Sequence, residues 1–188
     1  MNEWDICTMD RNGLQRRQVQ DQFRLLWEQH VYWTRMVILG IAFDSPDLAA
    51  STNRLLRNAT DFGRLFARYY GNAVGQNLER LFRDHLTIAG ELVEAAKAGN
   101  TKAAADLEQR WYANSDEIAR YLRRINPAWQ VRPMMDMWHE HLSLTKQEAV
   151  AILDQDFRRS IAVFEEIEEL ALEMADEFSA GITGQFLR

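Results

Sequence analysis

The stretch FRLLWEQHVYWTRMVILGI, residues 23–41, contains the pattern that decides the fold. Its core-type residues recur at alternating steps of four and three, which is typical of the buried face of an α-helix packed against other helices. They are Phe23, Trp27, His30, Thr34, Val37 and Ile41. The same spacing returns in residues 78–96 and in residues 134–152. Three copies of one helical face predict an all-α fold with an internal repeat.

A helix-start signal follows each copy at the same distance. Ser45, Asn100 and Asp156 lie 15 residues after the histidine of their copy, and these residue types commonly cap helix N-termini. Pro46 also suits a first helical position. Short turns make successive helices antiparallel, so we predict an up-and-down antiparallel helical bundle built from three repeated helical hairpins, about six helices. The expected helices cover residues 14–43, 46–70, 73–98, 101–125, 133–153 and 156–183.

Length and composition indicate one ordinary globular domain and exclude several partners. The chain has 188 residues, of which 47% are hydrophobic and 27% charged, with a formal net charge of -6. We expect a flexible leader over residues 1–13 and a single domain over residues 14–188. No run of Lys and Arg would follow a phosphate backbone, so nucleic acid is not an expected partner. The longest apolar stretch near the start, residues 36–43, is too short to span a membrane.

The expected location is the cytoplasm. The first residues do not read as a secretion signal, and the single cysteine, Cys7, cannot form an internal disulfide, which fits a reducing compartment. A homo-oligomer is compatible with this sequence, as is a small-molecule ligand.

One histidine occupies the same position in each copy of the pattern: His30, His85 and His141. The first, third and fifth helices run in the same direction, so these side chains are expected at one level inside the bundle. Imidazole is a common metal ligand. Three imidazoles with a carboxylate and an open coordination position would suit Zn²⁺ or non-haem iron. The sequence therefore predicts a metal site or small-ligand site at this histidine layer.

The carboxylate would come from the helices that return past the same level. Asp61 and Glu117 belong to a shared pattern of asparagine, acid and arginine at steps of three, which begins at Asn58 and at Asn114. We therefore predict Asp61 and Glu117 as the metal-binding carboxylates. The turn count and this pattern differ by one residue in register, so other acids stay open as alternatives. These are Asp116, Glu165, Glu168, Glu169 and Glu173.

A second interpretation needs no metal. Each histidine would be neutral and would hydrogen-bond an Asn, Asp or Thr side chain, because a buried polar group without a partner costs about 1–3 kcal/mol. The chain would then be a non-catalytic structural or interaction protein whose histidine layer fixes the register of the helices. Neither the HExxH zinc pattern nor paired Glu-x-x-His motifs occur, and the sequence leaves open whether the protein is an enzyme.

Several segments resemble a small all-helical bacterial family. They are LWEQHV (26–31), NRLLRN (53–58), AAKAGN (95–100) and RWYAN (110–114), and the likeness extends from about residue 25 to 180. Some members are labelled acetylglutamate kinase, so the resemblance implies kinase activity as a third, weaker expectation. Amino-acid kinases hold ATP with glycine-rich loops that follow strands. This sequence predicts neither feature, and no catalytic residue is carried over.

Overall fold

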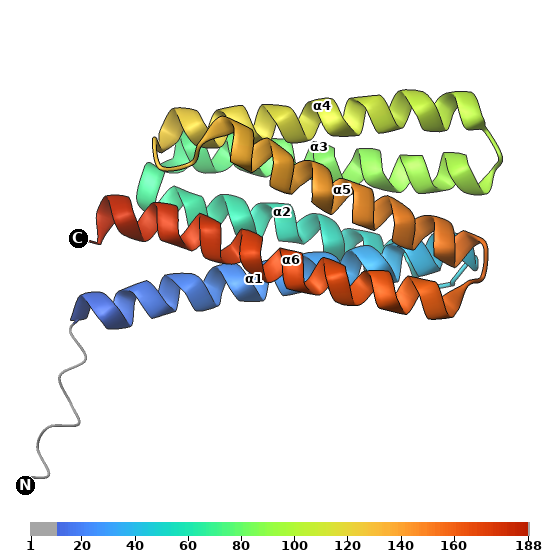
Figure 1. Ribbon diagram of the computed structural model, residues 1–188, viewed down its shortest axis with the longest axis horizontal. Helices are drawn as coiled ribbons and strands as arrows, with labels where there is room; N and C mark the ends of the chain where they lie inside the picture. Colours follow the sequence, from blue (N-terminus) through green and yellow to red (C-terminus); the bar gives the residue numbers. More distant parts are fainter. Residues whose placement is uncertain (1–10, 188) are drawn as a thin grey trace, which may run out of the picture.

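The computed structural model describes residues 11–187, which form six α-helices and no strand (Figure 1). The helices are α1 (Arg11–Ala42), α2 (Leu48–Tyr70), α3 (Asn72–Lys97), α4 (Thr101–Ile125), α5 (Val131–Leu153) and α6 (Phe157–Phe186). Most of the predicted leader, including Cys7, lies outside the described residues. Residues 11–13 already belong to α1, so the predicted leader extends too far. No helix in the described range has the length and apolar character needed to cross a bilayer.

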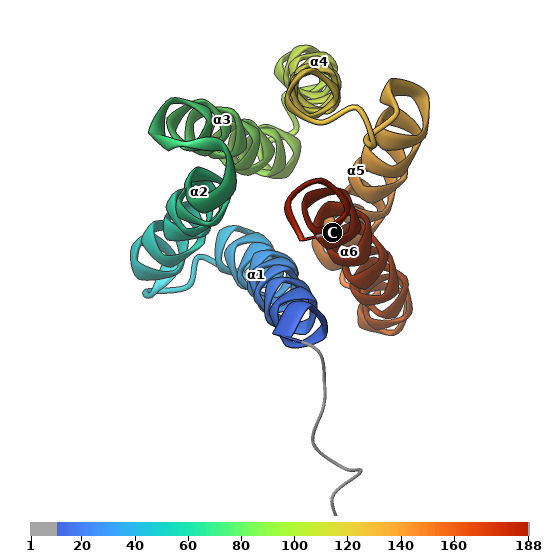
Figure 2. The ribbon, with the colours of Figure 1, turned by 90° about the vertical axis from the view of Figure 1, so that its left-hand side faces the viewer.

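The six helices form a ring in chain order, with α6 closing against α1 (Figure 2). Each helix contacts its neighbours in the sequence, which confirms the up-and-down bundle. Helix α1 also contacts α3 and α5, so it lies nearest the centre. Helix α1, which contains His30, therefore lies against the two other helices that contain a histidine of the pattern, α3 and α5.

The three hairpin turns share one backbone conformation. Asp44, Gly99 and Gln155 each have a positive φ, of 53°, 68° and 59° respectively. In each turn the next backbone N–H donates to the carbonyl five residues earlier, as in a Schellman motif. The bonds run from Ser45 to Gly40, from Asn100 to Ala95 and from Asp156 to Ala151, at 3.0, 2.9 and 2.8 Å. These turns place the following helices at equivalent heights.

Two of the three predicted N-caps are confirmed. The side chains of Asn100 and Asp156 accept hydrogen bonds from the backbone N–H groups of Ala103 and Arg159, both at 3.1 Å. The prediction of Ser45 as a cap was wrong, because α2 begins only at Leu48.

The late start of α2 has a local cause. The Ser45 carbonyl accepts from the N–H of Leu48 at 3.1 Å, and the Ser45 hydroxyl donates to the Asp47 carboxylate. These bonds close a turn over residues 45–48, so Pro46 lies in that turn and not in the first turn of the helix.

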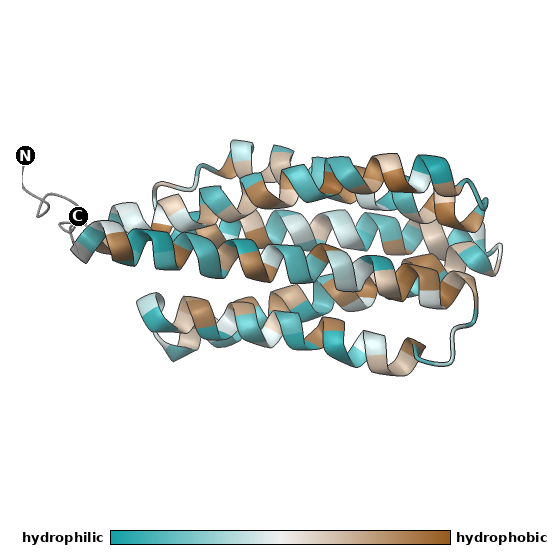
Figure 3. Ribbon diagram, turned by 90° about the horizontal axis from the view of Figure 1, so that it is seen from below, coloured by the Kyte–Doolittle hydropathy of each residue, from teal (hydrophilic) through white to brown (hydrophobic). Residues whose placement is uncertain are grey.

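The interior is mainly aromatic at the level of the histidines and on the side of the chain termini. Among the largest fully buried side chains are Phe23, Trp27, Phe62, Phe66, Phe82, Trp129, Trp138 and Phe178. Polar and apolar residues alternate along the helices (Figure 3), as expected when each helix buries one face. This packing holds the histidine-bearing helices in fixed positions.

Helices α2 and α3 approach most closely at two glycines. A Cβ atom on Gly75 would lie 2.5 Å from the carbonyl oxygen of Gly63 and 2.7 Å from the Cβ of Ala67. A Cβ on Gly63 would lie 2.8 Å from the Gly75 carbonyl oxygen. The two backbones are thus in direct contact, and neither position has room for a side chain.

Replacement of Gly75 should test this contact. We expect Gly75→Ala to lower the free energy of unfolding by about 1–3 kcal/mol, because the added methyl group overpacks a backbone contact. Gly90→Ala on the same helix is the matched control, since its Cβ would meet nothing within 4 Å. It should instead raise stability by about 0.5–1 kcal/mol through helix propensity. Urea unfolding of both variants measures their free energies of unfolding. If both values shifted in the same direction relative to the wild type, the proposed backbone contact at Gly75 would be contradicted.

Candidate functional site

All three predicted histidines lie in the interior of the bundle. His30, His85 and His141 are 1%, 1% and 2% exposed, on α1, α3 and α5. The rings of His30 and His141 are in contact, with centroids 5.5 Å apart. His85 lies on the other side of Trp138, whose ring centroid is 5.1 Å from that of His85 and 6.0 Å from that of His141. The structure therefore brings two imidazoles together and separates the third by an indole.

Two histidines are held by asparagines from the returning helix of their own hairpin. The Asn58 amide N–H donates to the Leu26 carbonyl at 2.9 Å, which turns its oxygen toward Nδ1 of His30 at 3.2 Å. Because that partner atom is an acceptor, Nδ1 of His30 carries the hydrogen. The first hairpin is thus tied across its two helices by one side-chain amide.

The second hairpin repeats this arrangement and adds a bond. Asn114 donates to the Leu81 carbonyl at 3.2 Å and accepts from Nδ1 of His85 at 2.9 Å. The indole N–H of Trp111 donates to Nε2 of His85 at 3.1 Å. Both nitrogens of His85 therefore have protein partners, and the role of Trp111 was missed in the sequence.

The third histidine differs from the other two. Nδ1 of His141 has no hydrogen-bond partner among the described residues. Asn114 follows His85 by 29 residues, and the same step from His141 reaches Leu170 on α6, a buried apolar residue. The indole N–H groups of the adjacent Trp27 and Trp138 are also buried without a partner in the described chain. The third hairpin thus lacks the amide that satisfies the other two histidines.

Burial keeps these imidazoles neutral. It lowers the pKa of His30 to about 4 and that of His85 to about 3. The bonds to Asn58 and Asn114 act in the opposite direction, but desolvation is the larger effect. The pKa of His141 is also well below its usual value, because of burial and the neighbouring histidines.

The two predicted carboxylates lie elsewhere. Asp61 pairs with Arg57 and Arg64 at 3.3 and 3.4 Å, and Glu117 pairs with Arg80 at 3.4 Å. Within the described residues neither acid is bonded to a histidine of the layer. The reason is that the asparagine of each shared pattern takes the inward position, while the acid of the pattern pairs with arginines at the surface.

Few side chains that could bind a metal lie close to one another in the described part of the chain. Between residues 11 and 187, no three or more His, Cys, Asp and Glu side chains are grouped so that they could hold a metal ion. Metal binding by the histidine layer stays a prediction, and its nearest pair of ligands is His30 and His141.

A buried ion pair lies beyond the layer and was not singled out as a site from the sequence. Glu148 on α5 is 1% exposed and accepts a hydrogen bond from the guanidinium of Arg35 on α1. Burial raises the pKa of Glu148 to about 7, and the Arg35 charge opposes that shift. Arg35 also lies 5.0 Å from the ring centroid of Phe164 on α6. The ion pair thus joins the central helix to the third hairpin.

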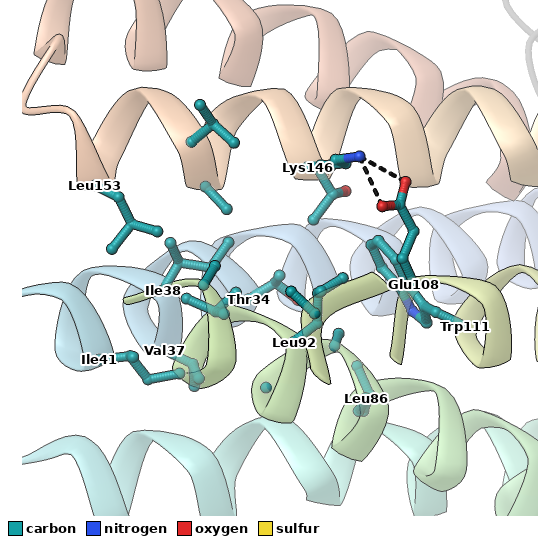
Figure 4. A pocket seen from close by; sticks show the side chains of 18 of the residues that line it. Thr34, Val37, Ile38, Ile41, Leu86, Leu92, Glu108, Trp111, Lys146 and Leu153 are labelled. Atoms are coloured by element: carbon teal, nitrogen blue, oxygen red, sulfur yellow. Dashed lines mark hydrogen bonds and ion pairs between the residues drawn. The ribbon is translucent and has the colours of Figure 1, made fainter. Parts of the chain in front are cut away.

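A cavity of about 300 Å³ lies between α1, α3, α4 and α5 (Figure 4). Its lining is mostly aliphatic and includes Ile38 and Leu92. Thr34 and Thr145 also line it, each one helical turn beyond His30 or His141, so the cavity begins next to the histidine layer. Sequence reasoning missed this space. The available signal was a set of small residues on three helices, namely Ala89, Gly90, Ala96, Ala104, Ala105 and Ala149.

No protein-family model, curated protein or solved structure matches this chain.

The neutral histidines predict a stability that depends on pH. The unfolded chain binds protons below the usual histidine pKa of about 6.5. In the folded protein the pKa is about 4 for His30 and about 3 for His85, and that of His141 is also lowered, so the folded imidazoles resist protonation. Stability should therefore fall as pH drops from 6.5 toward 4, by up to about 1.4 kcal/mol per pH unit for each histidine. Glu148, with its raised pKa, has the opposite effect: its protonation favours the folded state as pH falls from about 7 to 4.5. This single group is outweighed by the three histidines.

Urea unfolding at several pH values between 7 and 4.5 measures this dependence. His141→Leu should reduce the slope, since it removes one group that charges on unfolding. It should retain stability at pH 7, because Nδ1 of His141 has no hydrogen bond to lose among the described residues. An unchanged slope in the variant would contradict the expectation.

Proposed function

We propose that this protein binds a small apolar ligand in the cavity between α1, α3, α4 and α5, and that the histidine layer forms the hydrogen-bonded base of that site. The cavity is the observation that carries the proposal. Ligand pockets in proteins are typically about 300–1,000 Å³ and lined mainly by apolar side chains, and this cavity of about 300 Å³ has both properties. The bonds to Asn58 and Asn114 support the interpretation of the layer as structural.

Access to the cavity is provided between α4 and α5. Helix α5 diverges from α4 toward the end that carries the three hairpin turns (Figure 1). Ala105 on α4 and Val150 on α5 line the cavity and are exposed. Lys146 and Glu108 form an ion pair across these helices at 2.6 and 2.8 Å (Figure 4). A ligand would enter beside this ion pair.

The volume limits the ligand. An apolar cavity of about 150 Å³ holds benzene, so this one suits roughly ten to twelve non-hydrogen atoms. The hydroxyl of Thr145 already donates to the His141 carbonyl at 2.8 Å. The Thr34 hydroxyl is buried without a partner among the described residues, and it offers one hydrogen bond to a ligand. The ligand is therefore largely apolar, with few polar atoms.

Other parts of the proposal rest on the sequence. The absence of a basic run supports a protein without a nucleic-acid partner, and the single cysteine supports a cytoplasmic location. The shared conformation of the three hairpin turns supports an origin of the hairpins in one repeated unit.

Binding can be measured through Trp111, which lines the cavity and provides an intrinsic fluorophore. Octan-1-ol should change the tryptophan fluorescence and raise the melting temperature. Ala104→Leu, which fills the cavity from α4, should weaken binding at least tenfold. Ala162→Leu is the matched control, because Ala162 is exposed on α6 and is not part of the lining. Failure of octan-1-ol and of indole to bind the wild-type protein would overturn the proposed function.

A metal at the histidine layer is a second candidate. It is favoured by the contact between the His30 and His141 rings and by the unpartnered Nδ1 of His141, since two imidazoles can share one Zn²⁺ ion. Elemental analysis after expression with added Zn and Fe should then find about one metal per chain, and His141→Ala should abolish it. Protein without stoichiometric Zn or Fe would end this candidate and leave the cavity proposal unaffected.

A further inference from the structure

A second cavity lies next to the first. It has a volume of about 190 Å³ and lies between α1, α2 and α3, where Leu48, Thr52 and Leu56 of α2 form part of its wall. The two cavities share five lining residues. These are Val37, Ile41, Leu55, Leu86 and Gly90. Side chains of α1, α2 and α3 that line both cavities therefore form the boundary between the two spaces.

Gly90 lies at the boundary between the two cavities. Its neighbour Ala89 lines the first cavity only, and its other neighbour Glu91 lines the second only. Among the described residues, a Cβ atom at Gly90 would meet no atom within 4 Å apart from its own turn of helix. The glycine thus leaves open space between α1 and α3 at the point where the cavities meet.

We propose that the two cavities form one continuous site for an unbranched aliphatic carboxylic acid, whose chain enters between α4 and α5, passes Gly90 and ends between α1, α2 and α3. This inference rests on the proposed function and specifies the ligand class. A compact ring would fill the first cavity alone, whereas a flexible chain fits through the narrow opening at Gly90. On the scale of the benzene cavity, the second space adds roughly seven or eight atoms. The two spaces together suit roughly 17 to 20 buried atoms, so the preferred chain has about 18 carbon atoms.

The charges at the two ends of the site set the direction of the chain. The rim of the second cavity carries Glu91 and Glu94, both exposed, and their charges would repel a carboxylate. The opening between α4 and α5 carries the ammonium group of Lys146, which pairs with Glu108. The charges of Lys146 and Glu108 offset each other, whereas Glu91 and Glu94 are both negative, so the carboxylate head remains in solvent at the Lys146 end and the methyl end occupies the second cavity.

Calorimetric titration with sodium alkanoates of 8, 10, 12, 14 and 16 carbons, each below its critical micelle concentration, tests the proposal. Each added methylene group should tighten binding about fourfold where it is fully buried. Affinity should therefore keep rising through 16 carbons in the wild-type protein. If only the first cavity is used, affinity levels off near 12 carbons.

Two variants locate the chain. Gly90→Leu places a side chain in the opening and should make affinity level off near 12 carbons. Thr52→Phe fills the second cavity from α2 without touching the first, and should have the same effect while the 8-carbon acid binds as in the wild type. Gly184→Leu, at an exposed position on α6 that lines neither cavity, is the matched control. Circular dichroism confirms that each variant is folded.

The outcomes separate this inference from the proposed function. Binding of octan-1-ol without any alkanoate, or a wild-type affinity that stops rising at 12 carbons, would overturn the continuous site and leave a single-cavity binding protein. Loss of long-chain selectivity in Gly90→Leu and Thr52→Phe, but not in Gly184→Leu, is the expected result. Absence of binding by every alcohol and acid would overturn both proposals.

Discussion

The hydrogen bonds between His30 and Asn58 and between His85 and Asn114 fix the register of the first two hairpins. Each asparagine also donates to a carbonyl of the partner helix, so one amide satisfies two buried groups at once. A shift of either hairpin by one helical position would leave an imidazole and an amide unpaired in an apolar interior. Such unpaired groups cost about 1–3 kcal/mol each, and the polar layer thereby specifies how the helices align.

The third hairpin is held in a different way. Leu170 occupies the position equivalent to Asn114, and His141 is left with an unpartnered Nδ1 in the described chain. The ion pair between Arg35 and Glu148 connects this hairpin to α1 instead. The Ser160 hydroxyl on α6 accepts a further hydrogen bond from Arg35. A buried ion pair contributes little net stability, but it fixes geometry because either charge alone would be costly.

The polar layer divides the bundle into two unlike halves. On the side of the chain termini, rings such as Phe66, Trp129 and Phe178 pack against one another. On the side of the three hairpin turns, small residues leave the cavities open. Cavities of this kind lower the free energy of unfolding, because the side chains that line them lose packing contacts. A bundle that is tightly packed on one side of the layer can tolerate such space on the other, which is where a ligand would bind.

Local sequence patterns were sufficient to predict the six helices, two of the three N-caps and the burial of the three histidines, because apolar periodicity and helix caps act over only a few positions. The sequence also offered Asn, Asp and Thr side chains as possible partners of buried histidines, and Asn58 and Asn114 are two such partners. Only the packing of the helices against one another decided that Glu117 pairs with Arg80 of α3 and that Trp111 donates to His85. It also left Nδ1 of His141 without an amide partner among the described residues. It also decided where the cavities lie, since an empty space depends on how side chains from four helices fail to meet.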